Sequence, residues 1–276
     1  MSIFSDPLSP WRLPCRWLYP KDWCAEEFRQ GLEFLQRRPE LRHDGNKLTD
    51  SAGKEVWKVE LPAELGGAVA YKFCAGKAPW RYIINLSHPA REWRNYQALY
   101  RLGIPAAQVL AYGETRRGLM IQNSFIVTRF IEGTRDGTDF MPGGKRRDDV
   151  ELRKRFCELV APHLATLHRH GFFHKALHPR NVLYRGDTPE TMEVFLIDVA
   201  RCRIRFPWRM KSAVLFDLYT PLRDLELSPD ESREFLRLYH ENYPDCPFTL
   251  PELEDALRKY RRHHHKYNVL DGHPNS

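Results

Sequence analysis

Apolar residues recur at helical spacing in the second half of the chain. Between residues 151 and 170 they fall every three or four positions, the period of one helix face, and Gly171 stands where such a helix would end. This pattern predicts a long amphipathic helix. Further helices in the same half are predicted at 230–242 and 253–265.

Strand patterns are concentrated in the first half. The clearest is EVWKVEL at residues 55–61, in which apolar and polar side chains alternate. Ser87 and the proline two positions later indicate that a helix begins there and runs to residue 102. The other elements predicted before residue 132 are strands at 68–73, 108–112 and 124–131 and a helix at 25–37.

Strands followed by helices are typical of an α+β protein, and we expect one in two lobes. Residues 133–150 contain several glycines and a basic run, which indicates a hinge or linker. The predicted parts are an N-terminal extension at 1–40, a small lobe at 41–132 with an antiparallel sheet and one helix, and a mainly helical lobe at 151–276.

Composition indicates a folded protein. Apolar residues make up 42% of the chain, which is enough for a core. No run approaches the roughly 18 apolar residues of a membrane-spanning helix, and the first residues include an acid and prolines where a signal peptide would be apolar. The six cysteines form no CxxC pair, so neither a zinc site nor a disulfide framework is indicated. We therefore expect a cytoplasmic protein.

The formal net charge of +7 suits an anionic partner. Basic residues alternate with aromatic ones at 208–211 and again at 258–266, and such surfaces fit a phosphorylated sugar, an anionic lipid leaflet or nucleic acid. A solvated helix face is the simpler interpretation of each cluster taken singly. Because no DNA- or RNA-binding motif is present, nucleic acid is not expected as a partner.

Two short apolar runs flank a turn at residues 186–187, which predicts a β-hairpin. Asn181 precedes the first strand and Asp198 follows the second. Antiparallel pairing would bring both side chains to the same end of the hairpin. An amide and a carboxylate there could bind Mg²⁺. That they merely cap a turn and end a strand is an equally compatible interpretation.

Lys72 and Glu92 form a second candidate pair. In the strand predicted at 68–73, Lys72 shares a face with two alanines, which leave room for a flat ring. Glu92 lies on one helical stripe with Tyr96 and Leu99, and a carboxylate turned inward on that stripe requires a cation. The pair could hold the lysine ready for nucleotide phosphates. An ordinary surface glutamate is the simpler alternative for Glu92 alone.

Taken together, these segments resemble the protein kinases. VAYK, ending in Lys72, resembles the strand with the ATP-binding lysine, and Glu92 resembles the helical glutamate that pairs with it. The sequence HKALHPRN at 174–181 looks like the catalytic loop, and Leu196-Ile197-Asp198 looks like the strand that ends in the magnesium-binding aspartate. The four elements occur in the kinase order, so we expect a bilobal protein-kinase-like fold.

A finer resemblance, over roughly residues 45–245, is to the bacterial lipopolysaccharide kinases, which phosphorylate Kdo or heptose in the inner core. It is carried by REWR at 91–94, LGIP at 102–105, IDVAR at 197–201 and FDL at 216–218. The resemblance implies an ATP-dependent phosphotransferase with ATP and Mg²⁺ as cofactors. It also implies a sugar hydroxyl on a membrane glycolipid as acceptor.

The resemblance assigns roles to individual residues. Mg²⁺ would be held by Asn181 and Asp198, and the nucleotide phosphates by Lys72, which Glu92 would position. No GxGxxG motif precedes this lysine, so the candidate phosphate-covering turn is the one around Gly53. A turn at residues 66–67 is a weaker alternative.

The implied acceptor is an anionic glycolipid or a phosphorylated sugar. Arg201, Arg203 and Arg205 would favour such an acceptor. The stretch between residues 198 and 217 is short for a phosphorylated activation segment, which also favours a small or lipid-linked acceptor over a protein. A glycolipid acceptor implies peripheral contact with the cytoplasmic face of the inner membrane.

The main departure from the kinase pattern is Ala176. It occupies the position of the catalytic-base aspartate, two residues after His174 and five before Asn181. Loss of such a base typically costs about 10²–10⁴ in rate. Three explanations are open: a natural pseudokinase that binds nucleotide for regulation without turnover, an engineered inactive variant, or an enzyme with another base. His174 and His178 are the candidates for that base, and each also fits a structural role.

Overall fold

The computed structural model describes residues 47–51, 54–60, 67–75, 87–117, 120–175, 177–204 and 210–270. The chain forms two compact units. The first comprises Met1–Ala98 and Ala107–Glu132, and the second comprises Leu99–Ala106 and Gly133–Ser276. The predicted helix at 25–37, Gly53, Ala176 and Arg205 lie outside the described residues.

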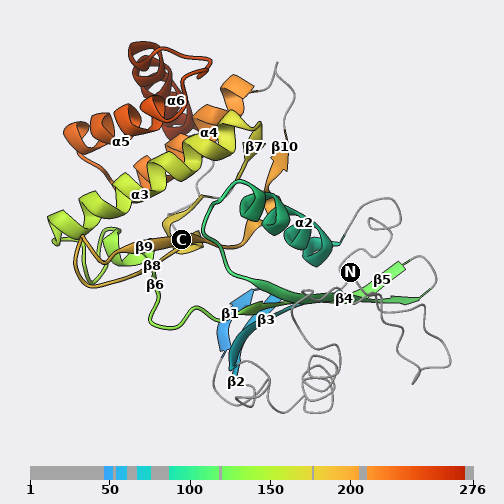
Figure 1. Ribbon diagram of the computed structural model, residues 1–276. Helices are drawn as coiled ribbons and strands as arrows, with labels where there is room; N and C mark the ends of the chain where they lie inside the picture. The colour runs from blue at the N-terminus through green and yellow to red at the C-terminus, as the bar shows by residue number, and fades with distance from the viewer. Residues whose placement is uncertain are drawn as a thin grey trace. The chain divides into compact units, whose positions relative to one another are not determined.

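A five-stranded antiparallel sheet forms the centre of the first unit (Figure 1). The predicted strands are confirmed, but the two later ones begin or end several residues away from the predicted bounds. A further strand at its edge was not predicted, because its sequence KLTDS lacks alternation and is held in the sheet by pairing with its neighbour. In spatial order, the strands are β1 (Lys47–Ser51), β2 (Lys54–Glu60), β3 (Ala68–Ala75), β5 (Met120–Arg129) and β4 (Val109–Arg117).

The helix predicted from Ser87 onward is α2 (His88–Arg101). Its first turn is capped by the Ser87 hydroxyl, which accepts a hydrogen bond from the Ala90 N–H at 3.2 Å. At its end, Gly103 has a φ of +67° and the Ile104 N–H donates to the Leu99 carbonyl at 3.0 Å. Such a left-handed glycine closes a helix at little conformational cost.

The second unit is mainly helical, as predicted (Figure 1). Its first helix, α3 (Val150–Arg169), lies where the apolar spacing of the sequence predicted it. Asp149 is its N-cap, and Gly171 adopts the left-handed region just after its end. Ser228 and Glu231 form a reciprocal capping box at the start of another helix. The helices are α3 (Val150–Arg169), α4 (Met210–Asp224), α5 (Pro229–Glu241) and α6 (Leu250–Leu270).

Short strands and single turns connect these helices. The predicted hairpin is present, and its first strand also pairs with a two-residue strand from the stretch predicted as a linker. That stretch buries Phe140 against Phe156 and Tyr184, at ring distances of 5.0 and 4.9 Å. The strands are β6 (Arg135–Asp136), β7 (Phe172–Phe173), β8 (Val182–Arg185), β9 (Glu193–Leu196) and β10 (Arg203–Ile204).

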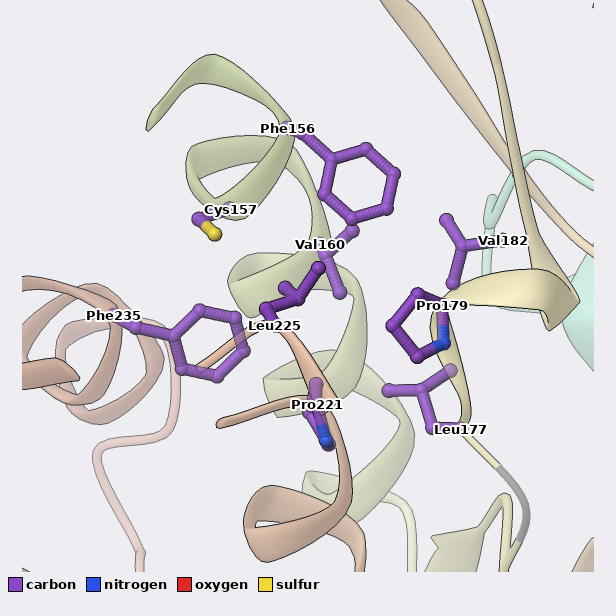
Figure 2. Close-up of a pocket in the computed structure, with 9 residues that line it drawn as sticks. All are labelled: Phe156, Cys157, Val160, Leu177, Pro179, Val182, Pro221, Leu225 and Phe235. Atoms are coloured by element: carbon purple, nitrogen blue, oxygen red, sulfur yellow. The ribbon is translucent and has the colours of Figure 1, made fainter. Parts of the chain in front are cut away.

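A small apolar cavity of about 10 Å³ lies within the second unit. It is enclosed by α3, α4, α5 and the loop before β8, whose side chains point into it in Figure 2. At this size and with apolar walls, the cavity offers a water molecule no hydrogen-bond partners. The lining residues are Phe156, Cys157, Val160, Leu177, Pro179, Val182, Pro221, Leu225 and Phe235. The cavity therefore belongs to the core that supports this loop.

No helix of the described residues is both long and apolar enough to span a bilayer.

Candidate functional site

The predicted ion pair between Lys72 and Glu92 forms in the first unit. The Lys72 ammonium lies 2.9 Å from Glu92 Oε2 and 3.2 Å from Oε1. Glu92 is only 3% exposed, and the Lys72 side chain is 13% exposed. The lysine stands in the middle of β3, where Val56 and Ile126 flank it on the neighbouring strands. A charged pair in this environment interacts more strongly than one on the surface.

A double-mutant cycle should measure this coupling. We expect an interaction energy of about 1–3 kcal/mol between Lys72→Met and Glu92→Gln, because both oxygens of a buried carboxylate contact the ammonium. Urea unfolding of the parent, the two single variants and the double variant gives the value. The matched control is the more exposed pair of Lys58 and Glu132, in which Lys58 Nζ lies 3.1 Å from Glu132 Oε1. This pair should have an interaction energy of about 0.2–1 kcal/mol. Equal coupling in the two cycles would contradict this account.

Asn181 and Asp198 meet at one end of the hairpin in the second unit, as antiparallel pairing predicted. Val182 on β8 pairs with Leu196 on β9, and the Ile197 N–H donates to the Asn181 carbonyl at 3.0 Å. The residues that follow the last pair are therefore Asn181 on one side and Asp198 on the other. Their amide and carboxylate oxygens are ligand types that Mg²⁺ accepts, so the donor set fits the metal.

Asp198 adopts an unusual backbone conformation. Its φ and ψ are 53° and 46°, in the left-handed region, and the chain turns there into a single 3₁₀ turn at Val199–Arg201. Non-glycine residues adopt this region at a cost of about 1–2 kcal/mol, and aspartate is among the residues that tolerate it best. The strand thus ends at Asp198 itself.

A buried carboxylate anchors the loop at residues 174–181. Asp217 of α4 accepts hydrogen bonds from the backbone N–H groups of His174 and Lys175, both at 2.7 Å. The Nε2 atom of His168 lies 3.3 Å from the same carboxylate, and its Nδ1 atom lies 2.8 Å from the Tyr239 hydroxyl. Lys175 itself has a φ of 60°, so this anchor fixes a backbone shape that a lysine seldom adopts alone.

Asp217 was predicted only as part of the FDL segment at 216–218, without a role of its own. Its signal was a single acid between apolar residues of a helix, at a position that proves fully buried. A carboxylate in such a place needs partners, and these partners are backbone groups more than 40 residues earlier. No side-chain pattern could reveal them.

His174 is fully buried, with 0% exposure. Burial lowers its pKa below the ordinary histidine value, although the nearby charges of Asp217 and Asp198 act in the opposite direction. A ring enclosed in this way cannot exchange protons with a substrate. Of the two histidines considered as substitutes for the missing base, His174 therefore fits the structural role.

The pKa of His174 should make stability depend on pH. The unfolded chain, with a histidine pKa of about 6.5, binds more protons than the folded one below that pH, so the free energy of unfolding falls as pH decreases. Half-buried His163, whose pKa is also lowered by burial, acts in the same direction. From pH 7 to pH 5 we expect the free energy of unfolding to fall by at most about 1.4 kcal/mol per pH unit for each histidine.

Urea unfolding across this pH range should show a weaker dependence of the unfolding free energy on pH for His174→Leu than for the parent. His170→Leu, at an exposed position, should leave the profile unchanged, and equal slopes in all three proteins would contradict the assignment.

His178 is held by a second carboxylate of α4. Its Nδ1 atom lies 2.7 Å from Asp224 Oδ2, and Arg223 Nε donates to Asp224 Oδ1 at 2.7 Å. Burial raises the pKa of the Asp224 carboxyl, but hydrogen bonds from His178 and Arg223 outweigh it, so the pKa lies below the usual aspartate value. The histidine side chain is 29% exposed and the aspartate side chain 11%.

The arginines suggested for the acceptor are only partly described. Arg201 is exposed at the end of the 3₁₀ turn that follows Asp198. Arg203 lies in β10, whose backbone pairs with Phe173 of β7. Gly53, Ala176 and Arg205 are outside the described residues, so their assignments stay predictions.

The chain is similar in fold to a solved structure of WaaP. Among solved structures, WaaP in complex with acyl carrier protein superimposes with a TM-score of 0.64 at 20% identity, over 91% of this chain and 98% of that chain, which is a likeness of fold. The PknI kinase domain of Mycobacterium tuberculosis, a C20A_R136A double mutant, gives a TM-score of 0.45 at 18% identity, over 78% and 93% of the two chains. No curated protein gives a significant sequence match.

The predicted α+β fold, with an antiparallel sheet and helix in one unit and mainly helices in the other, is confirmed. The sequence matches the lipopolysaccharide kinase (Kdo/WaaP) family over residues 76–239, which is more than half of the chain. That span contains Glu92, the loop at 174–181, and Asp198. The chain belongs to the lipopolysaccharide kinase (Kdo/WaaP) family.

Proposed function

We propose that this protein is an ATP-dependent phosphotransferase that acts on a sugar hydroxyl of the lipopolysaccharide core. The observation that carries the proposal is the end of the hairpin, where Asn181 and Asp198 lie together beside a loop anchored by Asp217. Family membership supports the reaction class. The buried pair of Lys72 and Glu92 supports nucleotide binding.

Each residue has one task in this proposal. Lys72 contacts the phosphates of ATP, and Glu92 fixes the direction of the lysine. Asn181 and Asp198 would hold Mg²⁺, which when bound would neutralise charge on the phosphates. Phosphoryl transfer passes through a loose transition state, so positioning and electrostatic stabilisation supply most of the acceleration.

The proposed acceptor is an anionic glycolipid or a phosphorylated sugar. A formal net charge of +7 favours association with it, and exposed Arg201 follows Asp198 closely in the chain. An acceptor embedded in a bilayer implies peripheral contact with the cytoplasmic face of the inner membrane. Since the solved WaaP structure is a complex with acyl carrier protein, a carrier protein is a second candidate partner.

The alternative is a pseudokinase that binds nucleotide for regulation and does not turn over. Ala176 at the position of the base favours it. The two proposals differ in one observable, which is phosphate on the acceptor. Nucleotide binding is common to both.

Transfer of radiolabelled γ-phosphate from ATP to purified core glycolipid tests the phosphotransferase directly. We expect slow, Mg²⁺-dependent labelling by the chain as it stands, and a loss of at least 10-fold in Asp198→Asn, since a proposed metal-ligand charge is removed. Glu193→Gln, on the exposed side of the same hairpin, is the matched control. Labelling that Asp198→Asn leaves unchanged would overturn the proposal. Nucleotide binding without any labelling, by this chain and by Ala176→Asp, would favour the pseudokinase.

A further inference from the structure

One stripe of α4 faces the loop at 174–181. Asp217, Pro221 and Asp224 are four and then three positions apart, so they lie on the same side of the helix. Asp217 binds the backbone of residues 174 and 175, and Pro221 borders the same cavity as Leu177 and Pro179 (Figure 2). Asp224 binds the His178 ring. The loop is therefore attached to α4 on both sides of position 176.

The contact with Asp224 fixes which nitrogen of His178 carries the proton. Because the depressed pKa of Asp224 keeps this carboxylate charged, the neutral imidazole places its hydrogen on Nδ1, 2.7 Å from the carboxylate. The lone pair is then on Nε2. Among the described residues, none forms a hydrogen bond with that atom. An imidazole held by a carboxylate with its second nitrogen left for substrate is the arrangement of a general base.

His178 is also near in sequence to the position that lacks a base, which it follows by two residues. Its side chain is 29% exposed, whereas His174 on the other side of position 176 is fully buried. Of these two histidines, only His178 is accessible to a substrate.

We propose that His178, oriented by Asp224, serves as the general base in place of the missing aspartate. This inference rests on the proposed phosphotransferase function. The acceptor oxygen forms a bond to the γ-phosphorus of ATP, and the bond from that phosphorus to the oxygen bridging the β- and γ-phosphates breaks, so ADP leaves. The hydroxyl proton moves to Nε2 of His178 and passes from there to solvent. His178 is the catalytic residue, and Asp224 is its positioning residue.

The test compares four proteins: the parent chain, His178→Gln, Ala176→Asp, and the double variant. Transfer of radiolabelled γ-phosphate to core glycolipid is measured for each, and nucleotide binding is followed separately by thermal shift with ATP and Mg²⁺. We expect His178→Gln to lower the transfer rate of the parent at least 10-fold while nucleotide binding persists. In the Ala176→Asp background the same change should cost less than about 3-fold, because an aspartate has taken over the proton.

Two further variants separate catalysis from packing. Asp224→Asn should lower the parent rate and leave the Ala176→Asp rate less affected, following the pattern of His178→Gln. His170→Gln, an exposed histidine of the same unit, should change neither rate by more than about 2-fold.

Several outcomes would overturn the proposal. An unchanged parent rate in His178→Gln would show that the imidazole takes no proton. Equal losses in the two backgrounds would show that His178 only supports the loop. If neither the parent nor Ala176→Asp labels the acceptor although ATP binds, the phosphotransferase function itself fails, and the role of His178 fails with it.

Discussion

Ala176→Asp should raise the rate of phosphate transfer from ATP to core glycolipid by about 10-fold or more, because His178 supplies only part of a well-positioned base's contribution in the parent. The backbone on either side of this position is already held, by hydrogen bonds from His174 and Lys175 to Asp217 and by burial of Leu177. A carboxylate placed there has flanking residues that are already fixed, and a well-positioned base contributes about 10²–10⁴ in rate. Initial rates at saturating ATP and Mg²⁺ give the ratio.

The control for this gain is Ala176→Asn, which has nearly the same shape and cannot accept a proton. It should stay within about 3-fold of the parent. A similar gain in both variants would show that packing at position 176, and not proton transfer, limits the rate. No gain in either variant would contradict the idea that the loop retains the arrangement of an active kinase.

Asp217→Ala should lower the free energy of unfolding by about 3–5 kcal/mol. The change leaves one buried and one half-buried N–H group without their acceptor and removes the charge beside the His168 ring. Each unsatisfied buried group costs about 1–3 kcal/mol. For a chain of this size the loss corresponds to a fall of about 10 °C in Tm, which differential scanning calorimetry resolves.

An exposed aspartate of the same unit provides the comparison for this loss. Asp230 lies in the first turn of α5, where it pairs with Arg233 and keeps most of its side chain in solvent. Asp230→Ala should cost less than about 1 kcal/mol. If the two variants unfold at the same temperature, Asp217 is not the anchor that its contacts indicate.

Much of the site follows from local rules. Alternation along β3 placed Lys72 beside small residues, and helical spacing turned Glu92 inward, so their pairing could be predicted. The meeting of Asn181 and Asp198 followed from antiparallel pairing alone. In each case the regular repeat of a strand or a helix determines the direction or the position of the side chain.

The contacts made by α4 follow no such rule. Asp217 and Asp224 reach a loop about 43 and 46 residues earlier, and their partners are backbone N–H groups and one ring nitrogen. Which helix packs against that loop depends on the tertiary fold. The same holds for Gly137, where an added Cβ would lie 2.7 Å from the Phe156 ring and 2.8 Å from the Pro179 carbonyl. Its need for glycine arises from packing and not from a turn.

The proposed function assigns a phosphate contact to Lys72 and a metal ligand to Asp198, and calorimetric titration of the chain with ATP tests both assignments. The account predicts a single binding event that strengthens when Mg²⁺ is present and that weakens at least 10-fold in both Lys72→Ala and Asp198→Ala. Lys58→Ala, in the neighbouring strand β2, should bind as the parent does. Binding that either of the first two variants leaves unchanged, or no binding at all by the folded parent, would contradict the account.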